Sequence, residues 1–374
     1  MVPRKRVGLK DVAALAATST ATVSRVLNGT GYASPTMRER VLAAAQTLHY
    51  EPSLRARGLR KQSSTTVGLI IPNLLNAYYT TLADTVGQLL SEAGYSLLLA
   101  SSRDEAPVER RILRDMVGHD VAGLLWVPTA PDPELLDYLD LQQVPVVCIV
   151  RAIRPHRVDT VVFEDFEGSR AATRHLLDLG HRRIGYIGGD DTHSSNQARW
   201  RGYQQALAEA GLAVEHSLAR LGALRSAWGF AAATDLLGLA DPPTAIFAAS
   251  NAVMPGVVRA IQQCRVAVPR DLSLVCFDDI EWFSFVTPPI TAVSVSCGTL
   301  AKTAVGLLME RVADREAAAQ PPVLREISFE LAVRGSTAPP RRKAARIRPA
   351  ERSQARPPEP AAVGERVWNT GREP

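Results

Sequence analysis

The sequence predicts an α/β protein with a small helical head at the N-terminus and a body of two doubly wound parallel sheets. Two short amphipathic segments joined by a tight turn predict the head. From Thr65 onward, short apolar runs alternate with helical stretches, as in parallel strands covered by helices on both faces. The charge changes near the same place. Residues 1–62 hold eleven Lys or Arg and three Asp or Glu, whereas residues 63–338 hold 23 and 31. This contrast places a polyanion contact at the head.

Length and composition limit the class of protein. A chain of 374 residues with 46% hydrophobic residues is too long for one core and suits two or three domains. No apolar run reaches about eighteen residues, and the start M-V-P-R-K-R lacks the apolar segment of a signal peptide. We therefore expect a cytoplasmic protein. The cysteines stand singly in apolar surroundings, so we expect neither disulfides nor a zinc site at Cys148, Cys264, Cys276 and Cys297.

The head begins with two helices. The first apolar stripe consists of Leu9, Val12, Ala13, Leu15 and Ala16, and Ala17-Thr18 forms the turn. In the segment Thr18 to Gly29, Val23, Val26 and Leu27 repeat at helical spacing. Two helices joined this tightly indicate a helix-turn-helix. We expect the remaining surface of the second helix to carry small polar and cationic residues, namely Thr20, Ala21, Thr22, Ser24, Arg25 and Asn28.

A third helix and a linker complete the N-terminal region. Ser34-Pro35 is a helix start, with Ser as the N-cap and Pro at the first helical position. The apolar positions that follow keep helical spacing as far as His49-Tyr50. Residues 53–64 hold one or two helical turns with a Gly at position 58, which is too short to be a stable helix alone. We therefore expect a head over 7–52 and a flexible linker over 53–64.

Two successive arrays of strands and helices predict two subdomains over residues 65–338. The first array runs from T-V-G-L-I-I-P to T-V-V-F, and the second from R-I-G-Y-I-G-G to L-S-L-V-C-F-D-D. The strand-like run Thr291–Ser296 and the helix Thr299–Arg311 are expected to return to the first array. The tail 339–374 is rich in Pro, Arg, Ala and Glu without apolar periodicity, and we expect it to be disordered.

Several of these motifs resemble a known family. L-K-D-V-A-A-L-A followed by S-T-A-T-V-S-R-V-L-N-G is similar to the N-terminus of the lac repressor (LacI/GalR) family of bacterial transcription regulators. In the body, Leu176 to Gly189 and Val275 to Glu281 match the same family, so the resemblance covers about residues 7–338. It implies a two-lobed body with the periplasmic sugar-binding protein fold, which closes on a small ligand. Without a C-terminal leucine heptad helix, a homodimer is expected.

The resemblance also assigns DNA-contacting residues. It implies that Thr20, Ala21 and Arg25 read bases, and that Thr22, Ser24 and Asn28 approach phosphates. Arg25 can form two hydrogen bonds to one guanine. The linker would become a hinge helix on DNA, with Leu59 as an apolar wedge in the minor groove and with Arg57 and Arg60 at phosphates.

An effector site is implied in the body. The matching positions are Asn76, Tyr78, Tyr79, Arg199, Ser250, Asn251 and Asp278. We expect Asp278 to accept ligand hydroxyls and Arg199 to reach across the cleft as a second anchor. Three positions depart from the family pattern. Val150 replaces an Asp, Ser250-Asn251 replaces Asn-Asp and Ala77 replaces a Pro. We expect a sugar or a related metabolite as the effector, with a less hydroxylated ligand as the alternative.

These observations predict a sequence-specific DNA-binding regulator, a repressor controlled by a small-molecule effector. The alternative is a cytoplasmic small-molecule binding protein whose head does not act on DNA. An enzyme is not expected, because the chain has no G-x-S-x-G, no P-loop and no G-x-G-x-x-G after a strand. We likewise expect no cofactor and no metal.

Overall fold

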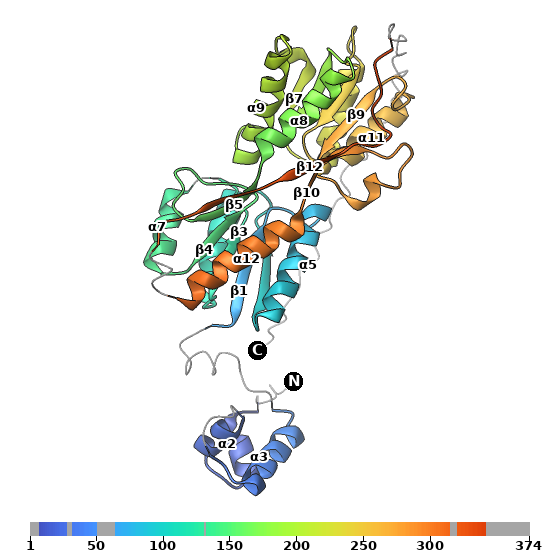
Figure 1. Cartoon of the computed structure of the whole chain (residues 1–374). Coiled ribbons are helices and arrows are strands. Elements are labelled where there is room, and N and C mark those ends of the chain that lie inside the picture. Colours follow the sequence, from blue (N-terminus) through green and yellow to red (C-terminus); the bar gives the residue numbers. More distant parts are fainter. Residues whose placement is uncertain (1–6, 28–31, 51–63, 131, 315–319, 342–374) are drawn as a thin grey trace, which may run out of the picture.

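The computed structural model describes residues 7–27, 32–50, 64–130, 132–314 and 320–341 (Figure 1). The predicted linker therefore falls outside the described residues except for Ser64, as does the tail beyond Arg341. The head contains α1 (Leu9–Leu15), α2 (Thr20–Leu27) and α3 (Pro35–Thr47). None of the described helices is long and apolar enough to cross a membrane.

Local signals fix the head helices. The Ser19 hydroxyl accepts a hydrogen bond from the Thr22 amide at 3.1 Å, and Ser34 accepts one from the Met37 amide at 3.4 Å. Both serines therefore serve as N-caps, as predicted for Ser34. The turn between α1 and α2 places Ala17 at φ 48°, in the left-handed region. The three helices pack around a small core of Val12, Ala13, Ala16, Val23, Val26, Val41, Ala44 and Ala45.

The first lobe is a six-stranded parallel sheet in the order β11-β5-β4-β3-β1-β2. Four helices accompany it (Figure 1), and two hydrophobic clusters pack against its two faces. The strands are β1 (Thr66–Ile71), β2 (Ser96–Ser101), β3 (Gly123–Trp126), β4 (Val146–Ile149), β5 (Asp159–Phe163) and β11 (Leu324–Ile327). The helices are α5 (Ala77–Glu92), α6 (Ala106–Gly118), α7 (Pro133–Leu141) and α12 (Cys297–Ala313).

The second lobe repeats this plan in the order β12-β10-β9-β8-β6-β7. Its strands are parallel except β12, which runs antiparallel to β10. The strands are β6 (Ile184–Gly188), β7 (Ala219–Leu221), β8 (Ala245–Ala248), β9 (Ser273–Phe277), β10 (Thr291–Val295) and β12 (Phe329–Ala332). The helices are α8 (Asp165–Asp178), α9 (Ser194–Glu209), α10 (Ser226–Leu237) and α11 (Met254–Gln263), with short 3-10 turns at His216–Leu218, Asn251–Val253 and Glu281–Phe283.

The chain crosses between the lobes three times. The crossings lie between β5 and α8, between β10 and α12, and between β11 and β12. Figure 1 shows these segments side by side at the waist of the body. Because each crossing is only one or two residues long, the waist can bend while the lobes remain intact.

One prediction about the crossing between β10 and α12 is wrong. The run at Thr291 was expected to return to the first array, but β10 pairs with β9 and β12 in the second sheet. Ala292 and Val293 belong to the second lobe's core, whereas Leu300 and Leu308 of α12 belong to the first lobe's core. Helix α12 therefore returns to the first lobe, whereas the strand before it, β10, belongs to the second lobe.

Candidate functional site

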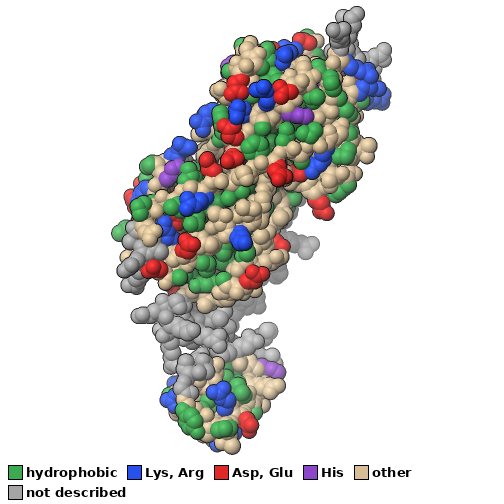
Figure 2. Space-filling view, in the orientation of Figure 1, with side chains coloured by type: hydrophobic (Ala, Val, Ile, Leu, Met, Phe, Trp, Pro, Cys, Tyr) green, Lys and Arg blue, Asp and Glu red, His purple; other side chains and the backbone are tan. Residues whose placement is uncertain are grey.

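The first candidate site is the exposed face of α2. Thr20, Ala21 and Arg25 are exposed, Thr22 is half-buried, and the first turn of α2 contains no acidic residue. A helix whose first turn lacks acidic residues and whose last turn carries the exposed Arg25 suits an anionic partner. Over the body, by contrast, Lys and Arg are interspersed with Asp and Glu on the face drawn in Figure 2.

Ser24 differs from its expected position. It is only 5% exposed, although the polar face of α2 was expected to include it. Both α1 and α3 pack on α2, so the buried arc is wider than a single apolar stripe. The remaining predicted DNA contacts, Asn28, Arg57, Leu59 and Arg60, lie outside the described residues.

The second candidate site is a cleft between the two lobes. The space between its walls is ≈ 570 Å³, open solvent at its mouth included. The strand ends and helix starts of both lobes line it, as the fold requires. Six of the seven predicted effector residues line it, namely Asn76, Tyr78, Tyr79, Arg199, Ser250 and Asp278. Asn251 lies behind them, where its amide donates to Asp278 Oδ2 at 3.3 Å.

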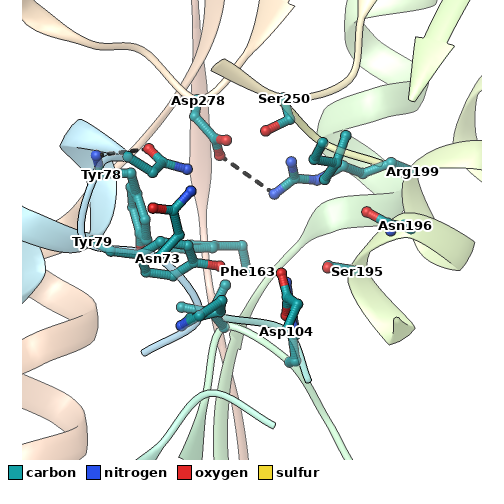
Figure 3. Close-up of a pocket in the computed structure, with 15 residues that line it drawn as sticks. Asn73, Tyr78, Tyr79, Asp104, Phe163, Ser195, Asn196, Arg199, Ser250 and Asp278 are labelled. Atoms are coloured by element: carbon teal, nitrogen blue, oxygen red, sulfur yellow. Dashed lines mark hydrogen bonds and ion pairs between the residues drawn. The ribbon is translucent and has the colours of Figure 1, made fainter. Parts of the chain in front are cut away.

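Arg199 is the centre of a buried polar network in the second lobe (Figure 3). Its Nε donates to Asp165 Oδ1 at 2.7 Å, its Nη1 to the Ala249 carbonyl at 2.8 Å and its Nη2 to Asp278 Oδ1 at 3.3 Å. The guanidinium also lies over the Phe277 ring, 3.7 Å from its centroid. The expected reach of Arg199 across the cleft is thus not present, because every one of these partners belongs to the second lobe.

Burial sets the charges of this network. Desolvation raises the pKa of Asp165 to about 6, although the neighbouring Arg199 opposes that rise. The pKa of Arg199 stays above its ordinary range, because Asp278 and Asp165 outweigh the desolvation of the guanidinium. Asp278 has φ 68° at the end of β9, which directs its carboxylate into the cleft. It can therefore offer ligand hydroxyls an acceptor that is already held in place.

Aromatic residues form the first lobe's side of the cleft. Asn76 caps α5 by accepting from the Tyr78 amide at 3.0 Å, which sets the start of the helix beside the cleft. The Tyr78 ring meets the rings of Tyr79 and Phe163 edge to face, with centroids 5.4 Å and 6.1 Å away. Burial raises the pKa of both tyrosines, so these hydroxyls remain neutral. This wall offers an apolar face to a ring-shaped ligand.

Sequence reasoning missed several lining residues, namely Asn73, Asp104, Arg151, Phe163, Ser195, Asn196 and Leu224. These residues share their place in the fold, since most follow the carboxyl end of a strand or begin a helix. Val150 was noted only as a departure. It has φ 65°, which is unusual for a β-branched residue, and it directly precedes the buried Arg151.

Direct contacts also join the lobes at the edge of the cleft. The Ala152 amide of the first lobe donates to Ser194 Oγ of the second at 2.7 Å. His193 Nε2 lies 3.7 Å from Asp104 Oδ1. Burial and the nearby Arg151 lower the pKa of His193 to about 4, so this imidazole is neutral near pH 7.

The fold and these sites define a class of protein: a helix-turn-helix head joined to a two-lobed ligand-binding body. Comparison with known proteins agrees for each part. Residues 8–53 match the model described as bacterial regulatory proteins, lacI family. Residues 173–337 match the periplasmic binding protein-like domain.

Relatives extend this match over most of the chain. The HTH-type transcriptional repressor PurR of Photobacterium profundum is 32% identical over 308 residues, which are 82% of this chain and 92% of that protein. PurR of Haemophilus influenzae (strain PittEE) is 30% identical over 88% of this chain and 98% of its own length. The chain therefore belongs to the lac repressor (LacI) family, a family of DNA-binding transcription regulators, which confirms the predicted family.

Solved structures support the fold. A transcriptional regulator CelR–cellobiose complex has a TM-score of 0.67 and 30% identity, and the match covers 88% of this chain and all of that one (100%). A lac repressor dimer bound to operator and the anti-inducer ONPF has a TM-score of 0.78 at 24% identity, over 89% of this chain and 100% of that one. The predicted architecture of head and two-lobed body is thus confirmed.

Proposed function

We propose that this protein is a homodimeric transcriptional repressor whose affinity for operator DNA is set by a small molecule bound between the lobes. One observation carries the proposal: the chain combines an exposed helix-turn-helix face with a polar cleft at a waist that the chain crosses three times. Closing the lobes on a ligand would change the spacing of the two linkers in a dimer, and so the fit of two heads to DNA.

On DNA, the N-terminal part of α2 would enter the major groove. Thr20 and Ala21 offer a hydroxyl and a methyl group, and Arg25 offers a two-pronged contact with guanine. Thr22 and Asn28 would approach phosphates, and Ser24 would support α2 from within the head. Arg57, Leu59 and Arg60 would act in the minor groove and at the backbone there. The proposed domain bounds are 7–52, 53–64 and 65–338, followed by the tail 339–374.

In the cleft, Asp278, Ser250 and Asn76 would bind polar groups of the effector, and Tyr78 and Tyr79 would pack on its apolar face. The cellobiose complex of the relative CelR supports a sugar or a related metabolite as the effector. No reaction is proposed, because the named relatives are transcriptional regulators and not enzymes.

The test is a mobility-shift assay with the DNA upstream of the protein's own gene, over a series of salt concentrations. We expect a sequence-specific complex that weakens steeply with salt. Arg25→Ala should lower discrimination at one base position of each half-site by roughly 1–3 kcal/mol. Arg38→Ala is the matched control, because it removes another exposed head cation, from α3.

Two outcomes would contradict the proposal. Binding that does not distinguish the upstream DNA from unrelated DNA would favour a small-molecule binding protein that does not act on an operator. An unchanged base preference in Arg25→Ala, measured over a substitution scan of the site, would remove Arg25 from the base-reading face.

A further inference from the structure

The first turn of α9 separates two cavities between the lobes. On one side lies the effector cleft, which Ser195 and Asn196 help to line. On the other side lies a second cavity of ≈ 440 Å³, bordered by residues 128–130 and 151–154 of the first lobe and by residues 192–194 of the second. Arg151 lines both cavities. A ligand group bound at this turn would therefore be reached through the effector cleft. It would lie beside the buried guanidinium of Arg151.

The turn itself is electropositive. The N-cap residue His193 supplies no side-chain hydrogen bond to the helix, and the first turn holds no Asp or Glu. The first backbone N–H groups of a helix have no partner inside it, and over the sixteen residues of α9 the peptide dipoles sum toward this end. This helix end thus favours a negative charge.

Two buried side chains at this turn have open hydrogen-bonding capacity. Ser195 is 8% exposed and Asn196 is 6% exposed, and neither side chain has a hydrogen-bond partner within the described part of the chain. Their polar atoms nevertheless face the cleft rather than a sealed interior (Figure 3). Donors and acceptors that line a cleft without a protein partner are available to hydrogen-bond a ligand there.

Two arginines complete the positive surroundings. Arg151 is 6% exposed, and its Nη1 donates to Asp104 Oδ1 at 2.6 Å and to the Pro128 carbonyl at 3.1 Å. Arg154 lines the second cavity and has no ion pair within the residues that the structure describes. Arg151 Nη2 also donates to Asp104 Oδ2 at 3.4 Å, and because the Asp104 side chain is 41% exposed, a ligand anion would compete with it for the guanidinium.

We propose that the first turn of α9, together with Arg151 and Arg154, binds an anionic group of the effector, a carboxylate or a phosphate. The neutral part of the effector then occupies the cleft beside Asp278, whose carboxylate favours ligand hydroxyls over a second negative charge. This inference rests on the proposed function and deepens it, because it gives the effector a defined charge and a defined orientation.

The test measures thermal unfolding of the full chain with two probes, inorganic phosphate and acetate, at constant ionic strength against chloride. We expect a saturable rise of the midpoint by about 2 °C or more with at least one probe, because a ligand that binds only the folded state stabilises it. The larger rise identifies phosphate or carboxylate as the preferred group. Arg154→Gln should weaken binding about tenfold, because it removes a charged donor.

A reciprocal variant separates this site from general charge effects. Asp104→Asn should strengthen anion binding by roughly threefold or more, since it removes the group that competes for Arg151. Arg111→Gln is the matched control, because Arg111 is exposed on α6 and borders neither cavity. It should leave the anion response unchanged.

Several results would overturn the inference. They are no saturable rise with either probe, an equal rise in the wild type and in Arg154→Gln, or weaker binding in Asp104→Asn. Operator binding is measured separately. A chain that binds its upstream DNA without any anion response loses only this inference, whereas a chain that binds the anion but no specific DNA loses only the proposed function.

Discussion

Asp278 combines a backbone conformation and a charge that few other residues could supply. Its φ of 68° is in the left-handed region, where Asp and Asn are the side chains most readily accepted after Gly. Its two carboxylate oxygens hold Arg199 and Asn251, which come from different helical segments of the second lobe. A change of charge at this position can therefore be made without changing the backbone.

Asp278→Asn should abolish the response to effector and keep DNA binding. The amide fits the same conformation but loses the charge that strengthens hydrogen bonds to ligand hydroxyls, so effector affinity should fall about tenfold or more. Arg199 keeps Asp165 and the Ala249 carbonyl, so the lobe should stay folded. A ligand found by thermal shift among sugars, polyols and nucleobases is then added to the mobility-shift assay.

The control is Asp115→Asn, which removes an exposed carboxylate of α6. It should respond to the ligand as the wild type does. A normal ligand response in Asp278→Asn would show that Asp278 is not an effector anchor.

At the residue scale, the sequence identified those side chains whose role follows from a short motif. Ser34 was predicted as a cap from its own neighbours in the chain, and Asp278 from a short segment that resembles the family. Ser195 and Asn196 could not be identified in this way, because their role depends on Arg151, which is far away in the chain. Such a site exists only once two lobes meet.

At the element scale, glycines decide how closely α10 and α11 pack. A Cβ at Gly229 would lie 2.1 Å from the Val253 carbonyl oxygen, and a Cβ at Gly256 would lie 1.9 Å from the Ser226 carbonyl oxygen. Both obstacles are backbone atoms, which cannot move aside as a side chain can. The two helices therefore lie against each other directly.

Gly229→Ala should destabilise the protein by about 1–3 kcal/mol, as overpacking of a tight contact does. Gly306→Ala in α12 is the matched control, because nothing lies within 4 Å of the added carbon. The control should be more stable than the wild type by roughly 0.5–1 kcal/mol, since Ala favours a helix over Gly. Urea unfolding followed by circular dichroism measures both. Equal stability of the two variants would contradict the packing argument.

The helices and strands also show where the apolar periodicity of the sequence was enough to predict an element. The helix α12 lies over Cys297–Ala313, close to the expected Thr299–Arg311, and its apolar residues belong to the first lobe's core. The placement of β10 failed, since an apolar run of five residues fits a core in either lobe and only strand pairing decides between them. Ser24 failed for a related reason, because a helix packed by two neighbours buries more than its apolar stripe.

At the scale of the whole molecule, His193 couples the closed arrangement of the lobes to pH. Asp104, Arg151 and the Thr129 carbonyl face it from the first lobe, and Asp190 from its own lobe. In the closed form its pKa is about 4, below the ordinary 6.5. Protonation of His193 therefore opposes closure. Above about pH 6.5 this penalty is absent, and the free energy of closure becomes less favourable as the pH falls from there toward 4.

Acidification should therefore open the lobes and weaken effector binding. Between pH 7 and pH 5 the affinity should fall by at most about twenty-fold, the factor that linkage gives for these two pKa values. In His193→Gln most of this dependence should disappear. Isothermal titration across the range measures the affinity, and small-angle X-ray scattering measures the opening. A pH dependence that is identical in His193→Gln would assign it to another group.

The three crossings at the waist have a consequence for synthesis of the protein. The first lobe's sheet needs β11, and the second lobe's sheet needs β12, which directly follows it. The first lobe cannot complete its sheet until residue 327 has been translated, and the second lobe cannot until residue 332 has been, and in each case the segment must also have left the exit tunnel. The head, by contrast, is contiguous and can form while translation continues. A nascent chain would therefore have a folded DNA-binding end before it has any means of sensing a metabolite.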